Sequence, residues 1–233
     1  MTAATERARV HEGARALGVD LGARQLDQLI DYLNQLERWN RAHNLTAIRD
    51  RAGMLTHHLL DSLSVVAPLA RQRPAGGRLL DVGSGGGLPG AVIAIAAPQW
   101  QVTCVDAVAK KAAFVRQAAG ALGLANLESR HARVETLATP AFDVIVSRAF
   151  SSLADFVALS ARALAPGGLW LAMKGQSPAT EIAALPSDVE VFHVEPLHVP
   201  GLDAERCVVW MRPQHPLSDR PASPAPPTPP KAR

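Results

Sequence analysis

Hydrophobic and polar residues follow two patterns along this chain: short unbroken apolar runs, and longer stretches with helical spacing. Unbroken apolar runs are typical of strands buried on both faces of a parallel sheet. We predict such strands at residues 79–82, 101–105, 127–129, 142–146 and 169–173. Helices are predicted between them, at residues 89–97, 110–122 and 155–164. This alternation predicts an α/β fold, a doubly wound and mostly parallel sheet with helices on both faces.

Both ends of the chain depart from the alternation. Residues 5–17 and 25–40 are predicted as helices, and the second has apolar residues at helical spacing, so that face must pack on another element. Apolar runs at 189–194 and 207–211 are joined by a segment too short for a crossover helix. We therefore expect these two last strands to pair antiparallel and to close the sheet.

These patterns divide the chain into three parts. Residues 1–70 form a predicted N-terminal helical segment packed on the core, and residues 71–212 form the α/β domain. Residues 213–233 form a proline-rich tail, and eight of the last 22 residues are proline. Such a composition cannot bury a core, so we expect a disordered or polyproline-like tail, with binding of a partner as the alternative.

The net charge of +3 resides at the end of the chain. The last 22 residues, 212–233, hold four basic residues and one acidic residue, which equals the excess of the whole chain. The rest is balanced, so any binding of nucleic acid requires a local patch rather than a global field. The candidates lie near the N-terminal helices, at Arg38, Arg41, Arg49 and Arg51, with scattered solvated charge as the alternative.

Other features restrict the class of protein. Charged residues occur throughout the N-terminus and the longest apolar run is 91–97, so we expect a cytoplasmic protein without a membrane anchor. Cys104 and Cys207 lie within apolar runs, as buried free cysteines do. His57 and His58 are adjacent and point in different directions on a helix, so a linking helix is favoured over a metal site. We predict no metal.

The first candidate ligand-binding site lies in the sequence LLDVGSGGGLPG at residues 79–90, which contains the first predicted strand and the turn that follows it. The glycines at 83 and 85–87 remove every Cβ from the turn, so the backbone can adopt positive φ and present its N–H groups. Pro89 is predicted as the first residue of the following helix. A strand, a glycine turn and a helix N-terminus together indicate a nucleotide-like ligand.

Neighbouring residues narrow the choice of ligand. The chain has no G-x-x-x-x-G-K-[ST] motif, and Leu88 stands where the dinucleotide motif requires glycine or alanine. Asp81, two residues before Gly83, suits a cationic amino group and would repel a pyrophosphate. Asp106 ends the second strand, where a carboxylate can accept both hydroxyls of a ribose. Its alternative role is to cap the following helix.

Six motifs occur in one order along residues 26–211. They are HNLTAIRD, HHLLDSL, DVGSGGGLPG, RVE, SRAF and MKGQ. The acidic strand end, the GxGxG turn, the second acidic strand end and the antiparallel pair resemble class I S-adenosylmethionine-dependent methyltransferases. The six motifs together resemble the small-subunit (16S) ribosomal RNA methyltransferase G family, also called glucose-inhibited division protein B. Gly86 departs from the family pattern, in which proline or alanine is frequent, and this leaves the stiffness of the loop open.

The resemblance implies a class I fold, S-adenosyl-L-methionine as cofactor and methylation of N7 of one specific guanine in 16S ribosomal RNA. The family's cofactor contacts fall on Gly83, Leu88, Val134, Glu135 and Arg148. Gly85 and Asp106 complete the predicted cofactor-binding set, from the loop and strand-end arguments above. For Val134 and Glu135 the alternative is a single turn of helix without contact to a ligand.

The implied chemistry agrees with the residues present. Guanine N7 has a lone pair free of a proton, so no general base is expected, and the SRAF sequence replaces the Asn/Asp-Pro-Pro-aromatic motif of amino-group methyltransferases. Arg148 and Lys174 are candidates for positioning the substrate through phosphate or guanine O6, and Phe150 for stacking. The alternatives are a core position for Phe150 and a strand-end cap for Lys174.

Two other functions remain open from the residues alone. One is a class I methyltransferase that acts on a different RNA, a protein or a small molecule, because the glycine turn indicates only the cofactor. The other is a non-catalytic nucleotide-binding module. If the acceptor is 16S ribosomal RNA, the balanced charge and the aromatic content of 4% indicate folded RNA, a 30S particle or its precursor rather than an unstructured strand.

Overall fold

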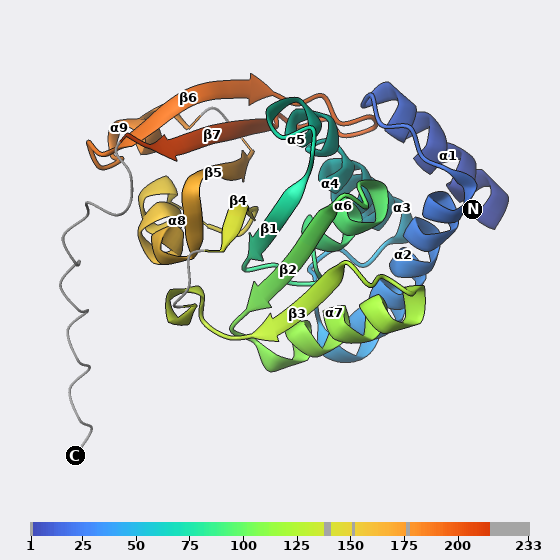
Figure 1. Cartoon of the computed structure of the whole chain (residues 1–233). Helices are drawn as coiled ribbons and strands as arrows, with labels where there is room; N and C mark the ends of the chain where they lie inside the picture. The colour runs from blue at the N-terminus through green and yellow to red at the C-terminus, as the bar shows by residue number, and fades with distance from the viewer. Residues whose placement is uncertain (1, 138–140, 151, 176–177, 215–233) are drawn as a thin grey trace, which may run out of the picture.

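The computed structural model describes residues 2–137, 141–150, 152–175 and 178–214 (Figure 1). Most of the predicted proline-rich tail and Gln176 of the MKGQ motif lie outside the described residues. Within the described part, no helix is long and apolar enough to cross a bilayer.

A seven-stranded sheet forms the centre of the described chain, in the order β3-β2-β1-β4-β5-β7-β6. β1 to β5 are parallel, whereas β7 runs antiparallel to both β5 and β6. The predicted parallel sheet and the antiparallel final pair are therefore confirmed. The strands are β1 (Gly77–Val82), β2 (Trp100–Asp106), β3 (Leu127–His131), β4 (Phe142–Ser147), β5 (Leu164–Lys174), β6 (Val189–Pro196) and β7 (Cys207–Pro213).

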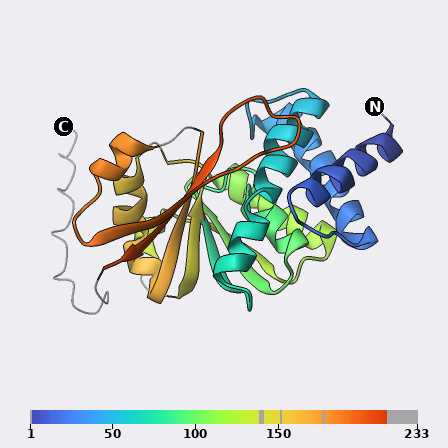
Figure 2. The same cartoon turned by 90° about the horizontal axis from the view of Figure 1, so that it is seen from above.

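Two layers of helices enclose the sheet (Figure 2). α5 (Val66–Gln72), α6 (Gly90–Ala96) and α7 (Ala109–Leu122) lie on the face that the N-terminal helices also cover, while α8 (Leu153–Ser160) and α9 (Ala179–Ala183) lie on the other. Successive residues of β1 point to opposite faces, so Leu79 joins the first core and Leu80 the second. This burial on both faces explains the unbroken apolar runs.

The predicted boundary between the last core helix and the fifth strand is wrong. The helix predicted to end at residue 164 ends at Ser160, and a 3-10 turn at Ala161–Ala163 follows it. Leu164 already pairs with Phe142 of β4, so β5 begins five residues before its predicted start at 169. The pairing then shifts register between Phe142 and Val144, which accommodates the Pro-Gly-Gly sequence of residues 166–168.

The N-terminal helices pack against the sheet domain through an apolar face. α2 (Ala23–His43) buries the residues that recur at helical spacing, and it lies against α6 and α7. α1 (Ala3–Ala16) packs on α2, and α3 (Arg51–Met54) continues through a π-helix (Leu55–Leu60) into α4 (Asp61–Leu63). Their buried side chains belong to the same core cluster as Leu79 of β1 and Val146 of β4.

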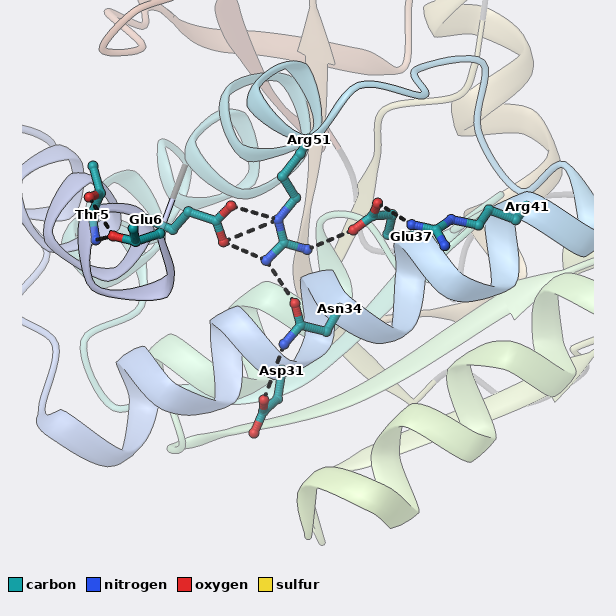
Figure 3. A network of polar contacts seen from close by, with 8 residues as sticks. Thr5, Glu6, Asp31, Asn34, Glu37, Arg41 and Arg51 are labelled. Atoms are coloured by element: carbon teal, nitrogen blue, oxygen red, sulfur yellow. Dashed lines mark hydrogen bonds and ion pairs between the residues drawn. The ribbon is translucent and has the colours of Figure 1, made fainter.

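Arg51 joins three of these helices (Figure 3). Its guanidinium donates to both carboxylate oxygens of Glu6 in α1, with the shortest contact at 2.7 Å, and to Asn34 Oδ1 at 2.8 Å. Its Nη1 also lies 3.3 Å from Glu37 Oε2, and Glu37 in turn pairs with Arg41. Arg51, one of the four candidates for a nucleic-acid patch, is therefore not scattered solvated charge, because its side chain is 20% exposed and these partners satisfy its charge within the helical segment. A contact with nucleic acid stays a prediction.

This network predicts that two arginines, which both join neighbouring helices, contribute differently to the free energy of unfolding. Arg51→Met removes the partners of the buried Glu6 and is expected to lower the free energy of unfolding by about 1–3 kcal/mol. Arg7 also contacts Asp27 at 2.7 Å, but both side chains are exposed, so Arg7→Met is expected to cost less than about 1 kcal/mol. Urea unfolding of both variants measures the difference, and equal losses would contradict it.

Candidate functional site

The loop between β1 and α6 is a tight turn held by backbone hydrogen bonds. Gly83, Gly85 and Gly87 have φ of 66°, 59° and 83°, a conformation that favours glycine. The N–H groups of Gly83 and Ser84 donate to the Val105 carbonyl, and Gly87 N–H donates to Ser84 O at 2.8 Å. Pro89 is the N-cap of α6 rather than its first residue, which shifts the predicted helix start by one position.

A pocket of about 220 Å³ opens beside this loop. Its walls come from both the N-terminal segment and the sheet domain. They are Leu36, Leu45, Thr46, His58, Gly83, Ser84, Gly85, Gly86, Leu88, Arg148 and Ala149. The predicted cofactor residues Gly83, Gly85, Leu88 and Arg148 thus lie together. The Gly86 N–H has no hydrogen-bond partner among the described residues, so a backbone donor is available at the pocket.

Asp81 lies behind the loop and outside the set of pocket-lining residues. It is fully buried, and its Oδ2 accepts the Gly90 N–H at 2.8 Å at the start of α6. Its Oδ1 has no partner within the described chain. Burial raises the pKa of Asp81 from 3.8 to about 7, against the lowering effect of the Gly90 hydrogen bond. The predicted contact of Asp81 with a cationic amino group stays a prediction, and its observed bond supports the helix.

Asp106 supports the glycine loop from the neighbouring strand. Its Oδ2 accepts the Gly85 N–H at 2.9 Å and its Oδ1 accepts the Val108 N–H at 2.8 Å, just before α7. The alternative role as a helix cap is not observed, because the N-cap of α7 is Val108 without a side-chain cap, and the Asp106 Oδ1 bond closes the turn before it. Each carboxylate oxygen has a second lone pair, so the predicted ribose contact is compatible with these bonds and stays a prediction.

Val134 and Glu135 form part of a 3-10 turn, Val134–Thr136, which follows β3. Val134 is buried in the same cluster as Val82 and Val105, the apolar residues at the ends of β1 and β2. Neither Val134 nor Glu135 lines the 220 Å³ pocket. The turn therefore lies at the same carboxyl edge of the sheet as the glycine loop, and its contact with a cofactor stays a prediction.

A second pocket, of about 420 Å³, adjoins the first. The two share Thr46, His58 and Arg148. Its remaining walls are Ala47, Ile48, His57, Asp61, Met173, Lys174, Gly175 and Arg206. The predicted substrate-positioning residues Arg148 and Lys174 therefore face one cavity. A ligand beside the glycine loop and a second ligand in this cavity would meet at the shared residues.

Asp61 connects two arginines at this second pocket. Its side chain is 3% exposed, and its Oδ2 accepts from Arg148 Nη1 at 2.9 Å while its Oδ1 accepts from Arg206 Nε at 2.9 Å. Arg148 Nη1 also donates to the His57 carbonyl at 2.9 Å. Sequence reasoning missed Asp61 and Arg206. The available signal was the carboxylate within the apolar HHLLDSL motif, since a buried charge requires a partner.

His58 is a buried, neutral wall of both pockets. Its Nε2 lies 2.8 Å from Thr46 Oγ1, and its Nδ1 has no partner among the described residues. Burial, followed by the charge of Arg148, lowers the pKa of His58 from 6.5 to about 4. Within the described ranges, no group of three or more His, Cys, Asp or Glu is placed to hold a metal ion.

Lys174 holds the loop that follows β4. Its Nζ donates to the Phe150 carbonyl at 3.0 Å and to Glu181 Oε2 at 2.7 Å. The Phe150 ring packs against Phe156 with centroids 5.4 Å apart, beside the second core. The observed contacts thus favour the alternative reading of Phe150 as a packing residue. Lys174 fixes the Phe150 backbone and also lines the second pocket, so its role toward substrate stays a prediction.

Comparison with known proteins decides the family. Residues 25–209 match the family model described as rRNA small subunit methyltransferase G. This chain belongs to that family. The ribosomal RNA small subunit methyltransferase G of Acidovorax sp. (strain JS42) is 63% identical over 214 residues, which cover 88% of this chain and 94% of the relative. The corresponding protein of Methylibium petroleiphilum is 62% identical and covers 87% and 92%.

Solved structures support the class I methyltransferase fold. A 1,6-didemethyltoxoflavin-N1-methyltransferase from Burkholderia thailandensis, with S-adenosylhomocysteine bound, aligns with a TM-score of 0.55 at 14% identity, covering 78% of this chain and 88% of that one. A SAM-dependent methyltransferase from Aquifex aeolicus aligns with a TM-score of 0.50 at 17% identity, covering 63% and 88%. At these identities the likeness concerns the fold alone.

The buried position of Asp81 predicts a pH dependence of stability. Its pKa is higher in the folded chain, about 7, than the ordinary value of 3.8, so between these values the folded state retains a proton that the unfolded state has lost. The contribution of Asp81 to the free energy of unfolding therefore falls as the pH rises from 3.8 to about 7. Relative to wild type, Asp81→Asn should gain about 1.4 kcal/mol per pH unit between pH 5 and 7. Urea unfolding of both proteins at pH 5 and pH 7 tests this prediction. The prediction is wrong if the free energies of unfolding of the variant and the wild type change by the same amount between the two pH values.

Proposed function

We propose that this protein transfers the methyl group of S-adenosyl-L-methionine to N7 of one specific guanine in 16S ribosomal RNA. Membership of the rRNA small subunit methyltransferase G family, over residues 25–209, is the observation that carries the reaction. Two adjoining pockets that share Arg148 provide separate places for a methyl donor and an acceptor. Transfer to a different RNA, a protein or a small molecule is the alternative, and no feature of these pockets favours it.

The residues beside the glycine loop fit the cofactor. Gly83 and Gly87 let the loop pack closely at the pocket wall, because an added Cβ would lie only 3.0 Å from Ala149 and Val115 respectively. The unpartnered Gly86 N–H offers a donor, and Leu88 offers an apolar wall. When bound, the cofactor supplies an electrophilic methyl group on a sulfonium. We assign its other contacts to Gly85, Asp106, Val134, Glu135 and Arg148.

The second pocket suits a guanine nucleotide. Arg148 uses its Nη1 on Asp61 and the His57 carbonyl, so donors on its Nε and Nη2 remain for guanine O6 or a phosphate oxygen. Lys174 and Arg206 add positive charge to the same cavity. N7 has a lone pair and no proton to remove, and His58, a neutral wall of the same cavity, does not repel the positive charge of the product.

We assign the reaction to the cytoplasm, and we propose that the RNA substrate is part of a 30S particle or its precursor. In this proposal the segment 1–70 and the domain 71–212 act as one unit, since both supply walls to each pocket. Catalysis then consists of holding N7 in line with the methyl group, away from water.

Methyl transfer from labelled S-adenosylmethionine onto purified 30S subunits lacking the modification tests the proposed function. The expected product is 7-methylguanosine at one site in 16S ribosomal RNA, with much less transfer to a short unstructured oligonucleotide of the same sequence. Transfer to RNA at another atom would contradict the N7 assignment. Cofactor binding without transfer to any form of the RNA would favour a different acceptor.

Arg148→Gln tests the residue shared by the two pockets. It removes the charge and the free donors, so we expect about a tenfold or greater loss in methyl transfer together with weaker cofactor binding. Arg116→Gln, at an exposed position of α7, is the matched control and should behave as wild type. Calorimetry and single-turnover transfer measure the two effects, and normal values of both for Arg148→Gln would remove the proposed role.

A further inference from the structure

Helix α2 reaches the glycine loop with two side chains. The Tyr32 hydroxyl donates a hydrogen bond to the Gly86 carbonyl, and Leu36, one turn later, lines the 220 Å³ pocket. The approach is close, because a Cβ added at Gly86 would lie 2.9 Å from Leu36 Cδ1. The N-terminal segment therefore contacts the loop predicted to bind the cofactor.

The position of the Tyr32 ring is fixed by its surroundings. Tyr32 is fully buried, and its ring lies 6.1 Å from that of Phe114 in α7. Among the described residues, its hydroxyl has the Gly86 carbonyl as its hydrogen-bond partner. Because the ring cannot shift without disturbing α2 and α7, the hydroxyl defines where that carbonyl points.

The peptide group between Gly86 and Gly87 is held at both ends. Tyr32 binds its carbonyl, and its N–H donates to Ser84 O at 2.8 Å. The preceding N–H, that of Gly86, has no partner in the described chain, and Gly86 lines the pocket. With the carbonyl turned to α2, its negative end does not oppose an anion beside the loop. The loop thus leaves the Gly86 N–H without a partner among the described residues, while its own carbonyl is bound by Tyr32.

We propose that Tyr32 is a positioning residue of the cofactor site, which holds the glycine loop so that the Gly86 N–H binds the carboxylate at the methionine end of the cofactor. This inference rests on the proposed function. It assigns the N-terminal segment a part in cofactor affinity, through a residue more than 50 positions from the loop in the chain. It also predicts that the effect of Tyr32 depends on the carboxylate of the ligand.

Tyr32→Phe removes the hydroxyl and keeps the ring. We expect binding of S-adenosylmethionine to weaken about three- to tenfold, the range for one hydrogen bond, whereas binding of decarboxylated S-adenosylmethionine changes less than about twofold. In methyl transfer to 30S subunits, KM for the cofactor should rise while kcat and KM for the particle stay unchanged. Calorimetry with the two ligands measures the difference.

Ser160→Ala is the matched control. Ser160 is fully buried, and its hydroxyl donates to the Phe156 carbonyl and accepts from Trp170 Nε1 in the second core, away from the loop. It removes a buried hydroxyl as Tyr32→Phe does, so it is expected to lower the unfolding midpoint and leave binding of both ligands at the wild-type value. A loss of affinity in Tyr32→Phe alone then reflects the loop rather than general stability.

A second measurement uses the unmodified sequence. Tyr32 is the single tyrosine of the chain, so tyrosine labelled with carbon-13 only at Cζ, the ring carbon that bears the hydroxyl, gives one signal in nuclear magnetic resonance. S-adenosylmethionine should shift this signal more than the decarboxylated analogue does. Equal shifts, equal losses of both ligands in Tyr32→Phe, or no loss would each overturn the role of Tyr32. Failure of the wild-type protein to bind S-adenosylmethionine would instead overturn the proposed function.

Discussion

The second pocket depends on the two ion pairs that the buried carboxylate of Asp61 makes with Arg148 and Arg206. Isolated in the interior, a carboxylate costs several kcal/mol, and here two guanidinium groups offset that cost from opposite sides. Arg148 directly follows β4 and Arg206 directly precedes β7, whereas Asp61 belongs to the N-terminal helices. One ion-pair network therefore connects three parts of the chain at the place where the pockets meet.

The same network determines what the pocket can do. Asp61 neutralises one positive charge and fixes two arginines, so their remaining donors keep a constant direction toward the cavity. The helix that carries Asp61 passes through a π-helical stretch, and within it the His57 carbonyl accepts from Arg148. Such irregular turns are frequent at functional sites. Because His58 is neutral, its ring adds no positive charge to the cavity, and the fixed arginines supply the donors that position a substrate.

Both pockets draw on the N-terminal helices. Leu36 and Tyr32 of α2 contact the glycine loop, and Thr46 lines both cavities. The Arg51 network in turn joins α1 and α2 to α3 (Figure 3). Residues 45–48, just before α3 in the chain, line the pockets. The helical segment is thus part of the site, although its apolar face gives it the appearance of a simple packing unit in the sequence.

The alternation of strands and helices, the antiparallel end of the sheet, the glycine loop and the family can all be predicted from the amino-acid sequence. These features depend on local periodicity and on motifs within a few residues of each other, such as Gly83 to Leu88. The contacts between side chains far apart in the sequence become visible only in the folded chain. Asp61 pairs with residues 87 and 145 positions away, and Tyr32 binds a carbonyl 54 positions away. Such contacts depend on how the N-terminal helices pack on the sheet, which no local pattern encodes, so Arg51 had the appearance of surface charge and Asp61 was missed.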